Sequence, residues 1–185
     1  MTTAVDQKDK PHQRLVLDQT AINEAASQSL DDGAVTPGYG PWRDDIVELL
    51  NGALATELVC VLRYKRHYFT ANGVASPAIA DEFLVHANEE SAHADKIAER
   101  IVQLGGEPDF NPKTLQERSH AGYDESTELQ AMVRANLVAE RIAIETYRQM
   151  IALIGDKDPT TRRMLEEILT DEEEHADELK DWLGH

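Results

Sequence analysis

After Pro41, apolar residues recur every three or four positions through most of the chain, which predicts amphipathic α-helices. Prolines, glycines and N-cap residues mark the ends of these helices. They predict four long helices, at about 41–72, 76–105, 126–155 and 158–184. No segment alternates with the period of a β-strand. The pattern therefore predicts an all-α main domain over residues 41–185.

The connections between the four segments predict how the helices are arranged. The first and third connections are short, which favours two antiparallel helical hairpins. The second connection, about residues 106–125, contains Pro108 and Pro112 and is long enough to run the length of a bundle. We therefore expect a four-helix bundle with one long crossover between the second and third helices.

Residues 1–40 differ in composition from the rest and predict an N-terminal extension that is partly helical or flexible. Within it, residues 15–30 have one apolar side and predict a short helix. The glycines and prolines of residues 31–41 predict a loop. Because the apolar side has no obvious place in a four-helix core, we expect residues 15–30 to pack on a neighbouring subunit or along the chain's own bundle.

The two predicted hairpins repeat the same polar residues. Each hairpin carries a lone glutamate, a tyrosine seven residues later, and an E-x-x-H motif, and the two motifs lie 82 residues apart. In chain order the repeated residues are Glu57, Tyr64, Glu90 and His93, then Glu140, Tyr147, Glu172 and His175. Nearly equal spacing in the two halves, 33 residues from Glu57 to Glu90 and 32 from Glu140 to Glu172, predicts a pseudo-two-fold axis between the hairpins.

The repeated glutamates interrupt apolar stripes, so they are expected to point into the core. Four converging buried carboxylates would repel one another, and two divalent cations would remove this repulsion. Di-metal four-helix bundles use this ligand pattern: two helices each supply one glutamate, and the other two each supply an E-x-x-H motif. Glutamate and histidine ligands with open positions suit iron or manganese better than a closed zinc site. A single E-x-x-H in an acidic helix arises by chance, and Glu172 lies in a run that would otherwise indicate a solvated face.

Charge and cysteine content narrow the class of protein. The formal net charge of −17 argues against a nucleic-acid partner. The single cysteine, Cys60, excludes an intramolecular disulfide framework and is expected to be a small buried residue. No stretch has the length and apolarity of a signal peptide or a membrane span, so a cytoplasmic location without membrane contact is expected.

Four segments resemble the ferritin-like superfamily, most of all bacterioferritins and bacterioferritin-type Dps-like mini-ferritins: NGALATELVCVLRY, EESAHADKIAERI, LVAERIAIETY and LEEILTDEEEHADEL. The resemblance covers about residues 41–183. It implies two iron ions per chain, with manganese or zinc as substitutes. The implied ligands are Glu57 and Glu140 as terminal carboxylates, Glu90 and Glu172 as bridging carboxylates, and His93 and His175 as nitrogen donors. It also implies oxidation of Fe²⁺ by O2 or H2O2, and storage of Fe³⁺ in a hollow homo-oligomeric cage.

Three departures from these families change the expectations. Ser91 stands where bacterioferritins have their haem-ligating methionine, so no haem is expected. The chain ends at DWLGH without the fifth helix of twenty-four-subunit cages, so a cage of about twelve chains is expected instead. Typical Dps proteins build their iron site between subunits and bind DNA through lysines, whereas the extension here is acidic, so DNA binding is not expected.

Other residues have alternative interpretations. Tyr64 and Tyr147 are predicted to hydrogen-bond carboxylate ligands, although plain core tyrosines are equally common. His86, one turn before Glu90, is a candidate for a third or transit iron, but a packed histidine is the commoner case. Glu145 points to another face of its helix and is expected to form an ion pair.

Two other functions remain open at this point. One is a di-iron or di-manganese peroxidase or catalase that stores nothing. Rubrerythrin-like peroxidases share the ligand set but usually carry a further glutamate where this chain has Ala143, together with a Cys-rich domain. The other is a stress protein that coats DNA and happens to bind iron.

Overall fold

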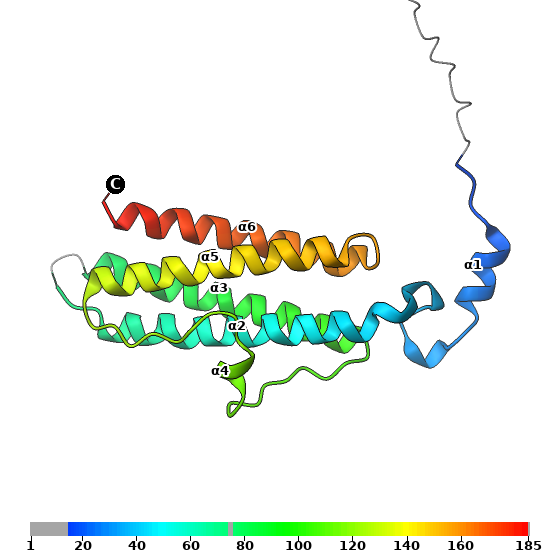
Figure 1. Ribbon diagram of the computed structural model, residues 1–185, viewed down its shortest axis with the longest axis horizontal. Helices are drawn as coiled ribbons and strands as arrows, with labels where there is room; N and C mark the ends of the chain where they lie inside the picture. Colours follow the sequence, from blue (N-terminus) through cyan, green and yellow to red (C-terminus); the bar gives the residue numbers. More distant parts are fainter. Residues whose placement is uncertain (1–14, 74–75, 185) are drawn as a thin grey trace, which may run out of the picture.

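Four long antiparallel helices form a bundle in the computed structural model, which describes residues 15–73 and 76–184 (Figure 1). The long helices are α2 (Arg43–Thr70), α3 (Ser76–Gln103), α5 (Leu129–Ile154) and α6 (Pro159–Trp182). Helix α2 packs along α3, and α5 packs along α6. The predicted all-α ferritin-like bundle of two hairpins is confirmed, and the described residues contain no strand.

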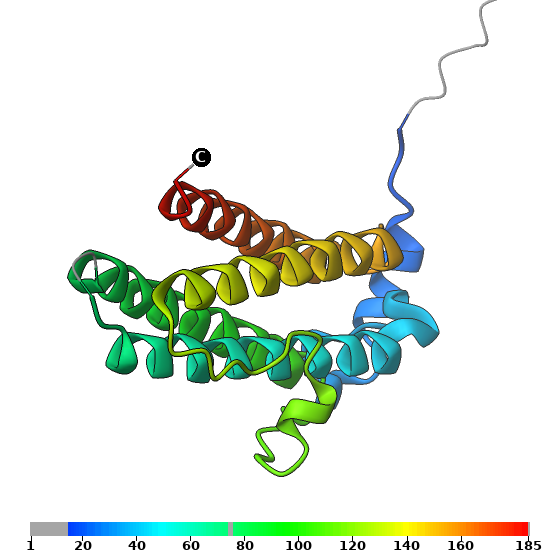
Figure 2. The ribbon, with the colours of Figure 1, turned by 60° about the vertical axis from the view of Figure 1, so that its left-hand side comes forward.

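The crossover between α3 and α5 returns along the outside of α2 and carries the short helix α4 (Leu115–Arg118) (Figures 1 and 2). Side chains of α2 hold the crossover by donating hydrogen bonds to its backbone carbonyls. Arg66 donates to the carbonyls of Ser126 and Glu125 at 3.0 and 2.9 Å, and the Asn51 amide donates to the carbonyl of Glu107 at 3.2 Å. The crossover therefore starts α5 at the end of the bundle where α2 finishes, as predicted.

Side-chain capping sets the start of both helices of the second hairpin. Asp158 caps α6 by accepting from the Thr161 N–H at 3.0 Å, as predicted. The predicted start of α5 at residue 126 or 127 is wrong by two or three residues. Glu128 accepts from the N–H groups of Gln130 and Ala131, so the helix begins at Leu129.

The predicted start of α2 at Pro41 is also wrong, because α2 begins at Arg43. The preceding residues form a 3₁₀ turn, Pro37–Trp42, and Gly40 within it has a φ of 61°. A left-handed residue cannot belong to an α-helix, so Gly40 separates the turn from α2. A second 3₁₀ turn spans Leu30–Asp32, across the boundary between the predicted helix 15–30 and the predicted loop 31–41.

The first described residues of the N-terminal extension, up to and including α1, project beyond the end of the bundle. Its only α-helix, α1 (Gln19–Ala26), is shorter than the predicted 15–30 and has no buried residue. Leu15, Val16 and Leu17 before it are 94%, 77% and 80% exposed. Figures 1 and 2 place α1 past the end of α2, so the alternative in which this segment lies along its own bundle is wrong. Residues 1–14 of the predicted extension lie outside the described residues.

The bundle core consists of two apolar clusters. One lies at the end that includes the start of α2, with Leu50, Leu54, Ile97, Ile101, Ile154 and Leu165 among its members. The other lies at the opposite end, with Cys60, Phe83, Ala87, Met132, Val133 and Leu179 among its members. Cys60 is buried, as predicted. Between the clusters the buried residues are charged, and this polar layer holds the repeated glutamates and histidines.

Candidate metal centre

The six residues singled out by the repeat come together between the two apolar clusters. Helix α2 contributes one glutamate, α5 contributes another, and α3 and α6 each contribute an E-x-x-H pair. All six side chains are at most 3% exposed: Glu57, Glu90, His93, Glu140, Glu172 and His175. Each sits on the core face of its helix because apolar residues precede and follow it at helical spacing.

The six side chains form two overlapping groups. Glu57 and His93 belong to the first group, and Glu140 and His175 to the second. The carboxylates of Glu90 and Glu172 belong to both, and within each group the potential ligand atoms lie within 4.8 Å of one another. Two shared carboxylates between two half-sites are the geometry expected of bridging ligands.

The Nδ1 atoms of both histidines point into these groups. His93 Nδ1 lies 3.2 Å from Glu172 Oε1 and 3.5 Å from Glu57 Oε2. His175 Nδ1 lies 3.6 Å from Glu90 Oε1. Every group of ligand atoms therefore combines one imidazole nitrogen with carboxylate oxygens.

Most atoms that face the centre have no hydrogen-bond partner among the described residues. They are Oε2 of Glu57 and Glu140, both carboxylate oxygens of Glu90 and Glu172, and Nδ1 of His93 and His175. Buried polar atoms normally have partners, because leaving them unpaired is costly. Two divalent cations would supply the missing partners and balance four carboxylates. The residues present therefore fit a pair of hard or borderline ions such as Fe²⁺ or Mn²⁺.

Two tyrosines hold the lone glutamates. The Tyr64 hydroxyl on α2 donates to Oε1 of Glu140 on α5, and the Tyr147 hydroxyl on α5 donates to Oε1 of Glu57 on α2. In each case the other carboxylate oxygen stays free to face the centre. The structure thus brings both predicted tyrosines into contact with carboxylates of the centre.

Two acidic residues that the sequence analysis missed hold the histidines. His93 Nε2 lies 3.0 Å from Asp171 Oδ2, and His175 Nε2 lies 2.8 Å from Glu89 Oε2. An imidazole that donates Nε2–H to a carboxylate keeps the lone pair of Nδ1 available for a metal. The signal was present in the repeat, because Glu89 and Asp171 also lie 82 residues apart.

The carboxylates of the centre do not share one protonation state. Burial raises the pKa of Glu57 well above its usual value, and the charge of Glu90 raises it further. Burial also raises the pKa of Glu90, but the close approach of Glu57 and the two histidines outweighs it, so the pKa of Glu90 falls. Burial and the charges of Glu90 and Glu57 also raise the pKa of Glu172 well above its usual value, so both Glu57 and Glu172 favour the protonated form when no cation is bound.

Both histidines of the centre bind protons tightly. Burial alone would lower the pKa of His93, but the nearby carboxylates of Glu57 and Glu90 raise it to about 10. Glu140 and Glu90 overcome burial in the same way and raise the pKa of His175 to about 11. Because a metal ion binds only the deprotonated nitrogen, it must displace these protons.

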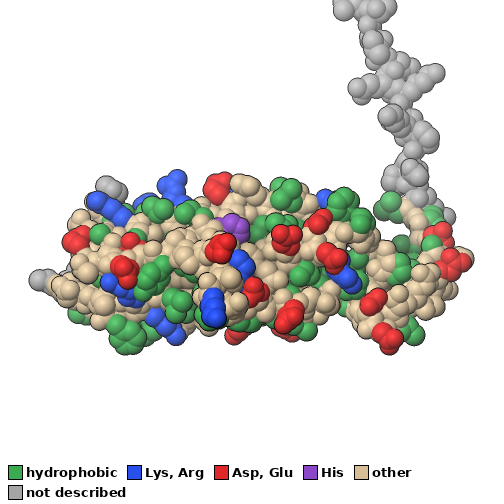
Figure 3. Space-filling view, turned by 60° about the horizontal axis from the view of Figure 1, so that its bottom comes forward, with side chains coloured by type: hydrophobic (Ala, Val, Ile, Leu, Met, Phe, Trp, Pro, Cys, Tyr) green, Lys and Arg blue, Asp and Glu red, His purple; other side chains and the backbone are tan. Residues whose placement is uncertain are grey.

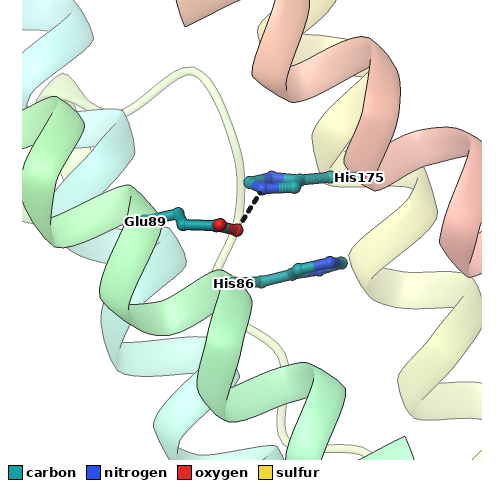
Figure 4. A group of neighbouring side chains, drawn as sticks. All are labelled: His86, Glu89 and His175. Carbon is teal, nitrogen blue, oxygen red and sulfur yellow. Dashed lines mark hydrogen bonds and ion pairs between the residues drawn. The ribbon is translucent and has the colours of Figure 1, made fainter.

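The remaining candidates lie around the centre. His86 is fully buried beside it, with its ring stacked on that of His175 at a centroid distance of 4.1 Å (Figure 4). Glu145 is exposed and pairs with Arg148 at 3.5 Å, as predicted. Ser91 is exposed on α3.

Fold and centre together define a four-helix-bundle protein with a buried glutamate–histidine layer. The ferritin-like domain family matches residues 47–185, and the chain therefore belongs to this family. Among the described residues, no helix combines the length and the apolarity that a membrane span requires.

Several relatives match over most of the bundle. The bacterioferritin of Rhodobacter capsulatus is 31% identical over 138 residues, which cover 73% of this chain and 80% of the relative. The nutrient stress-induced DNA-binding protein of Synechococcus sp. is 31% identical over 144 residues, 75% of this chain and 81% of the relative.

Solved structures show the same fold. The dodecameric thioferritin of Bacteroides fragilis, a bacterioferritin-related protein, superimposes with a TM-score of 0.73 at 33% identity, covering 76% of this chain and 85% of that chain. Dps from Thermosynechococcus elongatus gives a TM-score of 0.76 at 18% identity, covering 80% of this chain and 95% of that chain. The second likeness concerns the fold alone.

Proposed function

We propose that the chain is a ferroxidase that binds two Fe²⁺ per subunit and oxidises them to Fe³⁺ with O2 or H2O2. The observation that carries this proposal is the set of unpartnered, buried ligand atoms that converge from all four long helices. Glu90 and Glu172 are the bridging carboxylates, because each belongs to both groups. Glu57 and Glu140 are terminal carboxylates, and His93 and His175 are the nitrogen donors.

Iron is the substrate of this reaction, and the membership of the ferritin-like family together with the bacterioferritin relatives supports it. With H2O2, two Fe²⁺ and two protons give two Fe³⁺ and two waters. With O2, two Fe²⁺ and two protons give two Fe³⁺ and one H2O2. Holding two ions together lets both electrons leave in one event, which avoids one-electron radical products. Mn²⁺ and Zn²⁺ suit the same donors as substitutes.

The protein's own residues favour the oxidised ions. Four buried carboxylates stabilise the higher charge of Fe³⁺ over that of Fe²⁺. Tyr64 and Tyr147 keep Glu140 and Glu57 in position while leaving one oxygen of each free. Burial between two apolar clusters limits the access of bulk water.

The function we propose includes iron storage and detoxification in a cage of about twelve chains, which would also protect against oxidative stress. The related thioferritin of Bacteroides fragilis is a dodecamer, which supports this number over twenty-four. The exposed apolar residues of the extension supply a surface for contacts between neighbouring subunits.

Aerobic iron loading followed by native mass spectrometry and iron analysis tests this proposal. The wild-type protein should oxidise Fe²⁺ rapidly, and a particle of about twelve chains should accumulate far more than two irons per chain. The double variant Glu90→Ala, Glu172→Ala should lose rapid oxidation. Glu99→Ala, Glu167→Ala is the matched control, because both residues are exposed on the same two helices. If the variant Glu90→Ala, Glu172→Ala oxidised Fe²⁺ at the wild-type rate, the assignment of these residues to the ferroxidase site would be wrong.

A peroxidase that stores nothing is the alternative that uses the same centre. It would turn over H2O2 without accumulating iron, and it would be a monomer or dimer at micromolar concentration. The same experiment therefore separates the two functions by particle mass and iron content.

DNA coating is the less favoured alternative, although one relative is named a DNA-binding protein. The net charge of −17 opposes it. On the face shown in Figure 3, acidic and basic side chains are interspersed with no continuous basic stripe. A gel-shift measurement at low salt would reveal such binding.

A further inference from the structure

His86 on α3 is buried beside the centre but does not belong to its two groups. Figure 4 shows its ring parallel to that of His175, with Glu89 reaching past it to the His175 nitrogen. The Nε2 atom of His86 faces two other carboxylates, at 2.9 Å from Glu178 Oε2 and 3.7 Å from Glu82 Oε1. These three side chains form a second cluster of potential metal ligands.

The contact with Tyr64 makes Nδ1 of His86 a hydrogen-bond donor. The single Tyr64 hydroxyl proton is donated to Glu140, so the tyrosine oxygen can only accept from His86. His86 Nδ1 lies 3.2 Å from that oxygen and is therefore the N–H donor. Nε2, on the opposite side of the ring, lies against the Glu178 and Glu82 carboxylates, so one imidazole nitrogen and two carboxylates converge on one point. A divalent cation at that point would take a ligand atom from each of the three side chains.

The surroundings of His86 Nε2 favour a cation. Burial raises the pKa of Glu82, and the charge of Glu178 raises it further, so the two carboxylates repel each other. A cavity of about 160 Å³ adjoins them, lined by Val85, His175 and five acidic residues: Glu82, Glu89, Asp171, Glu174 and Glu178. No lysine or arginine of the described chain lines this cavity. A concave acidic wall of this kind concentrates cations.

We propose that Glu82, His86 and Glu178 form a third divalent-cation site, beside the six-residue centre and sharing no ligand with it. One imidazole nitrogen and two carboxylate oxygens suit Fe²⁺, Mn²⁺, Co²⁺ or Zn²⁺, with water in the remaining positions. The side chains of Glu82 and Glu178 are 27% and 44% exposed, so a cation can reach them from solvent.

The third site is connected to the centre on two sides. Tyr64 links His86 to Glu140 by hydrogen bonds, and the His86 ring stacks on His175. The site therefore lies between an acidic cavity and the centre, where it holds a cation before the cation moves inward. This supply role rests on the proposed ferroxidase function, whereas the binding site itself does not.

A titration of the metal-free protein with Co²⁺ under nitrogen counts the sites. We expect about three Co²⁺ per chain for the wild type and about two for Glu82→Gln, Glu178→Gln. The control Glu99→Gln, Glu167→Gln changes the charge equally, on the same helices but outside the cluster, and should still bind about three. Helix content and melting temperature show that each variant is folded.

Anomalous diffraction at the cobalt edge then locates each ion. A peak between Glu82, His86 and Glu178 that disappears in Glu82→Gln, Glu178→Gln supports the site. A wild type with cobalt only in the six-residue centre, or a variant that keeps the His86 peak, overturns it. A peak at His86 with an empty centre would leave the third site standing while the proposed function fails.

Discussion

At the scale of single residues, the hydroxyl of Tyr147 is the nearest support of a terminal carboxylate. We expect Tyr147→Phe to lower the affinity for Fe²⁺ about tenfold, because Glu57 loses a buried hydrogen bond that favours its ionised form. Anaerobic Fe²⁺ titration measures this effect. Tyr123→Phe is the control, since Tyr123 is 44% exposed. Equal affinity in both variants would show that the Tyr147 hydroxyl does not position the ligand.

Proton release should accompany metal binding. The pKa values of His93 and His175, about 10 and 11, mean that both rings are protonated at pH 7 without metal. Since metal binding must release these protons, the apparent affinity should rise with pH between 6 and 8. Calorimetry of Zn²⁺ binding in buffers of different ionisation enthalpy counts the protons released. No release at pH 7 would contradict the raised pKa values.

The same pKa values predict how the metal-free protein responds to alkaline pH. A histidine whose pKa is raised on folding stabilises the protein fully below its unfolded pKa, about 6.5, and this stabilisation is lost as pH rises through the folded pKa. The contribution of His93 should therefore disappear as the pH approaches and passes 10. Melting temperatures of His93→Gln should differ from those of the wild type mainly below this range.

Haem binding offers a further test at one residue. Because the resemblance to bacterioferritins places Ser91 where their haem-ligating methionine stands, we expect no Soret band after expression with excess haem. Haem in stoichiometric amount would show that another residue of this chain serves as the ligand.

The sequence predicted the residues that recur in both hairpins, but it did not predict those that contact a histidine on another helix. The six candidate ligands and both tyrosines stood out in the sequence because they recur at matching positions in the two hairpins, and the glutamates among them interrupt apolar stripes. Glu89 and Asp171 were missed because each precedes a motif glutamate by one position, which on an isolated helix turns it away from the core. Only the packing of α3 beside α6 brings each one to the histidine of the opposite helix.

At the scale of helices, the start of α6 combines a cap with a buried ion pair. Asp158 is fully buried, caps the helix and pairs with Arg100 at 2.9 Å. We expect Asp158→Ala to destabilise the metal-free protein by about 3 kcal/mol, because it removes the cap and leaves a buried guanidinium unpaired. Urea unfolding followed by circular dichroism measures this. Asp156→Ala, on the exposed side of the same turn, should cost much less.

The number and pairing of the helices followed from periodicity and connection lengths, whereas several of their ends did not. Glu128 was not recognised as the cap of α5, because glutamate is a weak N-cap compared with the nearby serine and threonine. Pro41 is typical of a first helical turn, yet Gly40 beside it holds a left-handed conformation and delays α2 to Arg43. Local contacts of this kind decide a boundary, and a single sequence does not contain them.

At the scale of the whole molecule, the extension divides into an anchored and a projecting part. Tyr39 accepts a hydrogen bond from Arg100 at 2.7 Å, and Val35 and Tyr39 pack on the apolar cluster at that end of the bundle. The residues before them, including Leu15, Val16 and Leu17, project from it. The projecting part is therefore the segment that can contact a neighbouring subunit.

Removal of residues 1–33 should weaken the cage while leaving metal binding intact, because all candidate ligands lie beyond α1. The triple variant Leu15→Ser, Val16→Ser, Leu17→Ser should have the same effect in smaller measure. Light scattering and native mass spectrometry report the assembly, and Co²⁺ titration reports the centre. An unchanged particle in both variants would place the subunit contacts elsewhere on the bundle.

The supports of the centre all cross between the hairpins. Tyr64 holds Glu140, Tyr147 holds Glu57, and the acids behind the two histidines come from the opposite hairpin as well. Neither hairpin alone contains a complete half-site, so a cation stabilises the docking of one hairpin on the other rather than either hairpin by itself.

Because these contacts all join one hairpin to the other, cation binding should make the unfolding of the two hairpins more cooperative. Without cations, four carboxylates face one another across the seam between two hairpins that each pack most extensively within themselves. The seam is then the weakest plane of the bundle, and amide hydrogens beside it should exchange through a partial opening. With cations bound, that opening would break the ligand sets, so the hairpins should exchange and unfold together. A bound pair of cations would thereby join the two hairpins into a single cooperative unit.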